Sequence, residues 1–258
     1  MTDTAYGTTA ESLSEAKVRA YRRDGFVHVP GVVSRDEVEE FRESAGEVAG
    51  RLKEQAMEYS TNVFTQLVNV WREDEVMERL TLHPNVGAVA QRLAGKPLRL
   101  WHDQMLIKEP HNEAATEFHQ DQPYWPHENS PDPISARIAL VDVPVERGCM
   151  TFIPGSHERT DLTPQDLEDE TSLFKMAPEL IWEPRVTVPL KAGDCTFHHG
   201  RVAHMATPNR TDEPRVAHVA IFMDADTLYV DKPHPVTDPL DLRPGQRLDG
   251  ELFPSVGA

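Results

Sequence analysis

Apolar residues recur at helical spacing in the first third of the chain. They alternate with polar residues at intervals of three and four, at Val38, Phe41, Ala45, Val48, Ala49 and Leu52. Ser34 and Glu37 stand where a capping box would begin this helix. Pro84 suits the first turn of a second helix, and Gly95 suits its end. We therefore predict that residues 1–95 form a helical part.

The pattern changes after Pro97 to short, partly alternating apolar segments. These segments are separated by glycine, proline and asparagine, and they span residues 98–108, 136–145, 149–154, 185–190, 194–199 and 215–223. Many short strands without helices between them favour a β-sandwich or barrel over a parallel sheet. We expect one domain, 1–258, that is mainly β with flanking helices. Its core would span 96–226, and a proline-containing tail, 227–258, would wrap around it.

One segment, 157–183, interrupts the strand pattern. It is acidic around Asp166–Glu170, and we expect a helical insertion there. Such an excursion between strands is either a lid or a solvated surface helix.

Charge and composition narrow the partners. The chain carries 26 Lys and Arg against 43 Asp and Glu, a net charge of −17. This argues against nucleic acid and leaves open a cationic substrate, although acidic surfaces commonly serve only solubility. No stretch is long and apolar enough to span a membrane, and the first thirty residues lack a secretory signal, so we expect a cytoplasmic protein without a membrane partner. Cys149 and Cys195 have no metal or redox spacing and are predicted to be buried thiols.

Histidine and aspartate at i and i+2 suggest a metal site. On a strand, the side chains of His119 and Asp121 would point to the same face. One histidine from a distant strand would complete a facial triad with open coordination positions. The chain has 12 histidines, so about one such spacing is expected by chance, and on spacing alone an unrelated surface pair is the more common explanation.

A second stretch, 193–222, is rich in histidine and supplies a cation. His198, His199 and His204 all lie in it, and Arg215 follows His204 by eleven residues. A planar guanidinium binds a carboxylate through two parallel hydrogen bonds, although an arginine at a strand end is more often a surface charge.

Three motifs in order resemble the phytanoyl-CoA dioxygenase family of iron(II)- and 2-oxoglutarate-dependent oxygenases. They are HQDQPYW at 119–125, GCMTFIPGSH at 148–157 and the stretch from 193 to 222 with its distal histidine, Pro-Asn turn and arginine. The resemblance implies a double-stranded β-helix, a cupin-like jelly roll. It implies that His119, Asp121 and His204 hold the iron, and that Arg215 binds the distal carboxylate of 2-oxoglutarate.

The resemblance also implies further contacts in the co-substrate pocket. Trp125, His102, Lys108 and Arg137 stand where relatives place them. The alternatives are a core tryptophan, a surface or loop-anchoring lysine and, for Arg137, a strand ion pair. His198 and His199 compete with His204 as ligand, and the spacing to Arg215 favours His204.

One position departs from the family. Many relatives carry serine two residues after the distal histidine, where this chain has Ala206. The missing hydrogen bond to 2-oxoglutarate would have to come from elsewhere, and Thr207 is one candidate. Asp121 also separates this chain from the related halogenases, which have a small residue there.

These observations predict a dioxygenase that uses iron(II), 2-oxoglutarate and O2. It would hydroxylate, desaturate or cyclise a small metabolite of secondary metabolism and release succinate and CO2. The alternatives are a non-catalytic jelly-roll protein that binds a metal or ligand, and an acyl-CoA hydroxylase, which the negative charge disfavours. Gln66, Asn69, Trp71 and the insertion at 157–183 are candidate substrate contacts.

Overall fold

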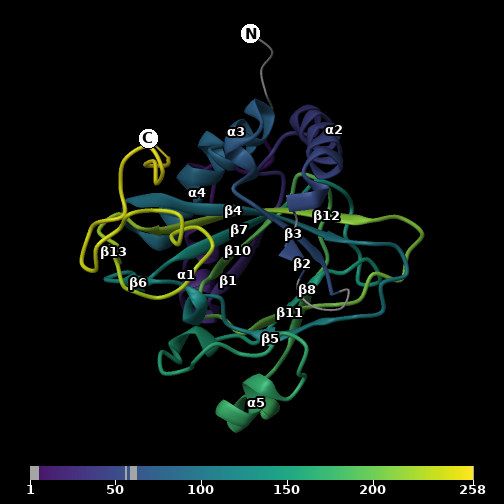
Figure 1. Ribbon diagram of the computed structural model, residues 1–258. Coiled ribbons are helices and arrows are strands. Elements are labelled where there is room, and N and C mark those ends of the chain that lie inside the picture. Colours follow the sequence, from purple (N-terminus) through teal and green to yellow (C-terminus); the bar gives the residue numbers. More distant parts are fainter. Residues whose placement is uncertain (1–5, 56, 59–62, 258) are drawn as a thin grey trace.

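Two antiparallel sheets form the centre of the molecule (Figure 1). The computed structural model describes residues 6–55, 57–58 and 63–257. The major sheet has the order β1-β10-β7-β12-β4-β3-β2 and the minor sheet the order β5-β11-β8-β9. The strands are β1 Phe26–Val29, β2 Met57–Glu58, β3 Thr65–Val68, β4 Leu98–Lys108, β5 Thr116–His119, β7 Ile134–Ala139, β8 Met150–Phe152, β9 Val186–Val188, β10 Cys195–His199, β11 His204–Ala206 and β12 Arg215–Asp224. This is the expected jelly roll with flanking helices.

Helices cover the outer face of the major sheet, on the side away from the minor sheet (Figure 1). They are α1 Glu15–Asp24, α2 Arg35–Arg51, α3 Glu75–Thr81 and α4 Pro84–Ala94. The capping box of α2 is present, with the Ser34 and Glu37 side chains each bound to the other's backbone N–H. Gly95 ends α4 in the left-handed region at φ 73°. Both helix predictions are confirmed.

The first third of the chain is less helical than predicted. It supplies β1 and β3, each of four residues, as well as β2, to the major sheet. β1 pairs with β10, and β3 pairs with β4. Segments this short have no decisive pattern of their own and become strands because a long strand elsewhere in the chain offers a pairing edge.

β4 has the predicted limits and contains a bulge. It pairs with β12 over ten positions, and Trp101 is an extra residue between the pairs Ile221–His102 and Phe222–Leu100. Beyond the bulge, His102, Gln104 and Leu106 face the space between the sheets. The alternate residues Met105 and Ile107 pack into the core beneath the helices.

The insertion at 157–183 is mostly irregular, which corrects the prediction of a helix. Its regular parts are α5 Ser172–Met176 and short 3-10 turns at Ser156–Glu158 and Pro178–Trp182. In the acidic run, the side chain of Asp166 accepts the N–H of Glu168 at 2.9 Å, and that of Asp169 accepts the N–H of Thr171 at 2.8 Å. These local hydrogen bonds compete with helix formation.

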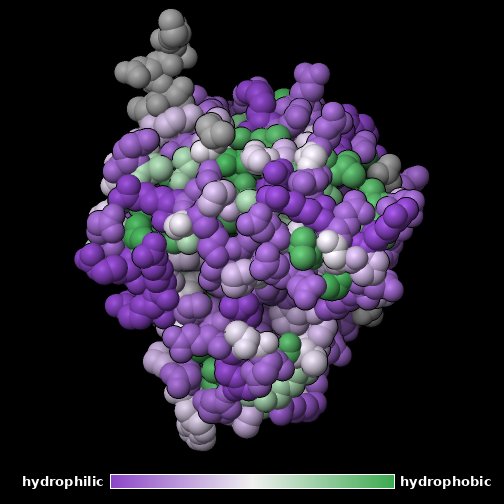
Figure 2. Space-filling view, turned by 90° about the vertical axis from the view of Figure 1, so that its left-hand side faces the viewer, coloured by the Kyte–Doolittle hydropathy of each residue, from purple (hydrophilic) through white to green (hydrophobic). Residues whose placement is uncertain are grey.

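The tail, 227–258, pairs with other parts of the chain. Its strand β13, Leu228–Tyr229, pairs with β6, His127–Glu128. Farther on, the carbonyl of Pro254 accepts the N–H of Leu100 at 2.9 Å, and Phe253 stacks on Trp101. Figure 2 shows that this side of the molecule is mainly hydrophilic, with scattered apolar residues.

The remaining expectations about the chain concern its thiols and its hydropathy. Cys149 and Cys195 are buried and unpaired, as predicted. Within the described ranges, the helices are all too short or too polar to cross a bilayer.

Candidate active site

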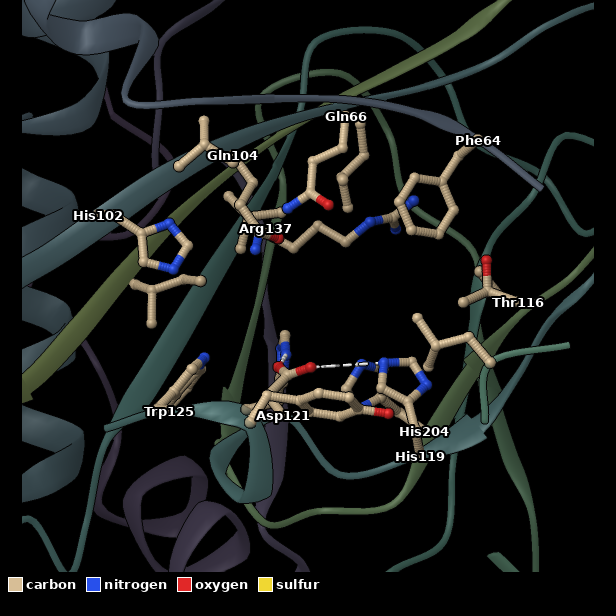
Figure 3. A pocket seen from close by; sticks show the side chains of 18 of the residues that line it. Phe64, Gln66, His102, Gln104, Thr116, His119, Asp121, Trp125, Arg137 and His204 are labelled. Atoms are coloured by element: carbon tan, nitrogen blue, oxygen red, sulfur yellow. Dashed lines mark ion pairs between the residues drawn. The ribbon is translucent and has the colours of Figure 1, made fainter. Parts of the chain in front are cut away.

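A cavity of about 300 Å³ lies between the two sheets. In Figure 3, Asp121, His119 and His204 lie along one wall, and Gln66 and Arg137 lie along the facing wall. His102 and Trp125 lie toward one end, and Phe64 and Thr116 lie toward the other. The volume is at the lower end of the usual range for small-molecule sites, so the cavity suits a compact ligand set.

Pairing between β5 and β11 brings the two histidines of the predicted triad together. His119 and His204 are direct partners across the strands, and their ring centroids are 4.3 Å apart. Asp121 Oδ1 lies 3.4 Å from His119 Nε2 and 3.8 Å from His204 Nε2. The three candidate ligand atoms all lie within 4.8 Å of one another, so they can share one metal ion.

Backbone carbonyls orient both imidazoles. His119 Nδ1 donates to the carbonyl of Glu117 at 2.7 Å, and His204 Nδ1 donates to that of Val202 at 3.0 Å. Each ring therefore presents an unprotonated Nε2 to the metal position. Burial lowers the pKa of His204 to about 3, which keeps its ring neutral. Burial alone would raise the pKa of Asp121, but the surrounding histidines lower it well below its usual value, so the carboxylate is ionised.

This donor set fits iron(II). Two neutral imidazoles and one carboxylate on one side of a cavity form a facial triad, which leaves coordination positions open toward the cavity.

The i, i+2 spacing works for a different reason from the one predicted. β5 ends at His119, and Asp121 has helical dihedrals, φ −76° and ψ −45°, at the start of a 3-10 turn. The residue between them, Gln120, points away from the cavity. Its Nε2 donates to the carbonyl of Arg201 at 2.6 Å and to those of Ser156 and Arg159 at 3.2 Å. Gln120 therefore fixes the turn that presents Asp121.

Three buried cations gather at the Thr116 end of the cavity. Arg215 and Arg137 line it, and Lys108, the strand partner of Arg215, lies behind them. Their hydrogen bonds are to carbonyls: Arg215 to Leu106 at 3.4 Å, Arg137 to Gly148 at 3.2 Å, and Lys108 to Ala114 at 2.7 Å. Arg215 Nε has no hydrogen-bond partner in the part of the chain that the structure describes.

No carboxylate of the described residues forms an ion pair with any of these three cations. Burial and the neighbouring Arg137 lower the pKa of Arg215 well below its usual range, and burial lowers that of Arg137 to about 10. Burial, followed by the two arginines, lowers the pKa of Lys108 to about 7. The charge of Glu117 opposes this shift only in part. A buried cluster of like charges without an ion pair is the environment that an anionic ligand would stabilise.

The other predicted residues divide between the cavity and the core. Trp125, His102 and Gln66 line the cavity, whereas Asn69 and Trp71 do not. Trp71 packs beneath the helices, which does not favour its role as a substrate contact. His102 lies at the end remote from Arg215, which does not favour a co-substrate contact.

The competing histidines also separate. His198 lines the cavity, with Nε2 3.6 Å from Asp121 Oδ2. His199 turns away toward the carbonyl of Pro131 at 3.2 Å.

Near Ala206, where relatives carry serine, the hydroxyl group that reaches the cavity belongs to Thr116 and not to Thr207. The hydroxyl of Thr207 donates to the carbonyl of Val145 at 2.7 Å, outside the cavity. Thr116 lines the cavity and is the cross-strand partner of Ala206. Thr116 and His234, which also lines the cavity, were not predicted, because no motif surrounds either residue.

Comparison with known proteins gives a consistent result. The sequence pattern of the phytanoyl-CoA dioxygenase family matches residues 21–217. L-proline trans-4-hydroxylase of Streptomyces griseoviridis is 32% identical over 148 residues, which cover 56% of this chain and 55% of that protein. Phytanoyl-CoA dioxygenase domain-containing protein 1 of Mus musculus is 29% identical over 157 residues, which cover 59% of this chain and 54% of that protein. The chain thus spans about half the length of these curated relatives.

Two solved structures match over nearly the whole chain. The non-heme alpha ketoglutarate dependent carbocyclase SnoK from nogalamycin biosynthesis is 40% identical, with a TM-score of 0.89, and the match covers 98% of this chain and 100% of that one. The epimerase SnoN, in complex with Fe3+, alpha ketoglutarate and nogalamycin RO, is also 40% identical, with a TM-score of 0.84 and coverage of 93% and 97%.

Proposed function

Because the chain belongs to the phytanoyl-CoA dioxygenase family, we propose that it is an iron(II)- and 2-oxoglutarate-dependent dioxygenase. The observation that carries the proposal is the position of the His119–Asp121–His204 triad in the same cavity as an uncompensated cation cluster. The triad fits the metal, and the cation cluster fits the far carboxylate of a dicarboxylate that binds the metal at its other end. A jelly-roll protein that only held a structural metal would have no use for buried arginines without counterions.

The iron would be held by Nε2 of His119, Nε2 of His204 and a carboxylate oxygen of Asp121. With 2-oxoglutarate and O2, the bound iron supplies an oxidant that removes hydrogen from a substrate carbon, with release of succinate and CO2. The chain itself keeps the two imidazoles in one tautomer through the carbonyls of Glu117 and Val202. It also surrounds the site with side chains such as Trp125 that limit access of water.

Arg215 would bind the distal carboxylate of 2-oxoglutarate, with Arg137 and Lys108 adding positive charge. Arg215 has an unused Nε–H, and its side chain is 2% exposed, so an ionic hydrogen bond there is protected from water. The hydroxyl of Thr116 replaces the serine that Ala206 lacks, because the two residues face each other across β5 and β11.

The substrate is proposed to be a small metabolite of secondary metabolism, in keeping with the nogalamycin enzymes that match the chain. Hydroxylation, desaturation and ring closure all begin with removal of hydrogen from carbon. Halogenation is disfavoured because Asp121 takes the place that a chloride would need. An acyl-CoA substrate is disfavoured because its phosphates would meet a protein of net charge −17.

A cationic group on the substrate would lie between Asp121 and the acidic insertion. Asp121 is the sole acid among the residues that line the cavity in the described chain. Asp166 and Glu168 line a neighbouring depression, which shares Phe64, Tyr124 and Leu167 with the cavity. The acidic insertion thereby has a route to substrate contact.

Anaerobic titration with iron(II) and 2-oxoglutarate tests the proposed function. We expect a weak metal-to-ligand charge-transfer band in the wild-type protein and its loss in Arg215→Met. Arg210→Met is the matched control, because Arg210 is exposed and pairs with Glu113. The absence of a band from the wild-type protein at saturating iron and co-substrate would refute the proposal. A band that persists in Arg215→Met would refute the role of Arg215.

A further inference from the structure

The end of the cavity remote from Arg215 has its own polar groups. Arg215 and Ile221 are six residues apart on β12, about 20 Å along the strand. Beside Ile221, the lining consists of His102 from β4, Trp125 and the tail residue His234. Figure 3 shows His102 and Trp125 together at this end.

His102 offers a hydrogen-bond acceptor. Its side chain is buried, and its Nδ1 lies 3.0 Å from the carbonyl of Asp103, to which it donates. The proton is therefore on Nδ1, and Nε2 carries a lone pair. Nε2 makes no hydrogen bond with any described part of the protein. Burial lowers the pKa of His102 to about 4, so the ring is neutral near pH 7.

His234 offers the complementary donor. Its Nδ1 accepts the N–H of Val236 at 3.2 Å, which places the proton on Nε2. Burial lowers the pKa of this ring to about 3, so it too is neutral. The ring centroids of His102 and His234 are 5.6 Å apart. One neutral ring thus presents a lone pair, and its neighbour presents an N–H.

Most of the side chains that pack around the pair are apolar. Trp101, Val219 and Ile221 pack in one cluster with Trp125, and the centroid of Trp101 is 5.1 Å from that of His234. The buried ring of His127 is a third imidazole beside Trp101, and the charges of Lys232 and Asp121 act on His234 and His102 respectively. The two neutral imidazoles of the pair provide no charge of their own to balance an ionic group. They suit a group that both donates and accepts a hydrogen bond, which is the property of an alcohol.

We propose that His102 and His234 form a subsite for a hydroxyl group of the primary substrate. The hydroxyl donates to His102 Nε2 and accepts from His234 Nε2, while the apolar body of the substrate packs against Val219, Ile221 and Trp125. This names a functional group of the substrate for the proposed oxygenase, an alcohol at the end of the cavity remote from Arg215, and it rests on that function for the reaction. His234 lies in the tail, beyond the residues that match the family, so the selectivity would be particular to chains that carry this tail.

Binding of matched probes to the metal-free protein tests the subsite. Cyclohexanol and methoxycyclohexane differ in the ability to donate, and their dissociation constants can be measured by saturation-transfer NMR. We expect cyclohexanol to bind about fivefold more tightly or better, because the ether leaves the acceptor of His102 unpaired. His102→Phe and His234→Phe should each reduce the preference to less than twofold, whereas His111→Phe, at an exposed ring, should keep it. Equal binding of the two probes to the wild-type protein would overturn the proposal, as would a preference that survives both substitutions.

The ring tautomers give a second test that needs no variant. Nitrogen-15 NMR should find His102 protonated at Nδ1 and His234 at Nε2, and the reverse assignment for either ring would overturn the proposal. Neither measurement uses iron or 2-oxoglutarate, so its failure is distinct from the loss of the charge-transfer band that would refute the oxygenase function.

Discussion

Replacing Arg215 by methionine should stabilise the protein while abolishing co-substrate binding. The guanidinium is buried beside Arg137 and Lys108, without an ion pair to a described carboxylate and with an unpaired Nε. In the absence of an anion, the buried charge of Arg215 lowers the stability of the fold, because it has lost its hydration without gaining a counterion. Methionine keeps an unbranched apolar chain in the same space and removes the charge.

The size of the effect follows from the balance of desolvation and hydrogen bonding. A buried charge costs several kcal/mol, and replacing buried ionic groups by apolar side chains of similar volume gains about 1–4 kcal/mol. Arg215 also loses its 3.4 Å hydrogen bond to the carbonyl of Leu106, which is long and contributes little. We expect the free energy of unfolding to rise by about 1–3 kcal/mol, or roughly 2–10 °C in Tm. With 2-oxoglutarate at about 100 times its Kd, the wild-type protein should gain about 2.7 kcal/mol and the variant nothing.

Thermal unfolding followed by far-ultraviolet circular dichroism provides the assay, anaerobically with iron(II), in the presence and absence of 2-oxoglutarate. The variant should be the more stable protein without co-substrate, and its advantage should be lost or reversed with it. Arg210→Met, on an exposed side chain, should change stability by less than about 0.5 kcal/mol in both conditions. A variant less stable than wild type without co-substrate would show that Arg215 supports the fold, and the reasoning would fail.

Four further experiments test other parts of the site. Thr116→Val should raise the calorimetric Kd for 2-oxoglutarate about tenfold or more, because a hydrogen bond to a carboxylate is lost. Adding Ala206→Ser, at the cross-strand partner of Thr116, should recover most of the lost affinity. An unchanged Kd in Thr116→Val would contradict the assignment of Thr116. Gln120→Leu should lower the free energy of unfolding by about 2–4 kcal/mol in urea denaturation, since the carbonyls of Arg201 and Arg159 lose their side-chain donor, whereas that of Ser156 keeps the N–H of Arg159. A loss below about 0.5 kcal/mol would show that water replaces the amide. Binding of 2-oxoglutarate near pH 8 should take up protons, because the anion raises the lowered pKa of Lys108. Calorimetry in buffers of different ionisation enthalpy would measure the number of protons taken up. Release of protons on binding would contradict this role of Lys108. The same lowered pKa predicts that the free energy of unfolding of the co-substrate-free protein increases as pH rises from about 7 to about 10. Over this range Lys108 stays protonated in the unfolded chain but not in the folded protein. A free energy of unfolding that falls over this range in urea denaturation would contradict the lowered pKa.

The sequence predicted the long strands and the ordered motifs well. Leu98–Lys108 has the predicted limits because eleven residues of mostly apolar sequence without glycine or proline leave few other structures possible. The triad, Arg215, Trp125 and Arg137 all reach one cavity as expected.

What the sequence did not predict depends on distant partners. β1 and β3 are strands only because β10 and β4 pair with them. The acidic insertion was expected to be helical, but aspartate side chains bind nearby N–H groups instead. His234 reaches the cavity through the path of the tail, and a single histidine among prolines carries no periodic signal. Such residues are placed by tertiary structure alone.

The bulge at Trp101 changes how the residues of β4 are divided between the cavity and the core. Ile221, which lines the cavity, pairs with His102, and Phe222, which lies in the core, pairs with Leu100, so Trp101 is an extra residue between two parts of the strand. Because of it, Leu100 before the bulge and Met105 and Ile107 after it all face the helices, although their numbers differ in parity. Deletion of Trp101 would restore regular alternation and leave His102 in the cavity, whereas deletion of one residue between His102 and Lys108 would invert one part of the strand relative to the other. The hydroxyl subsite and the cation cluster therefore depend on the number of residues between His102 and Lys108, and in that stretch point substitutions are a safer route for change than insertions or deletions.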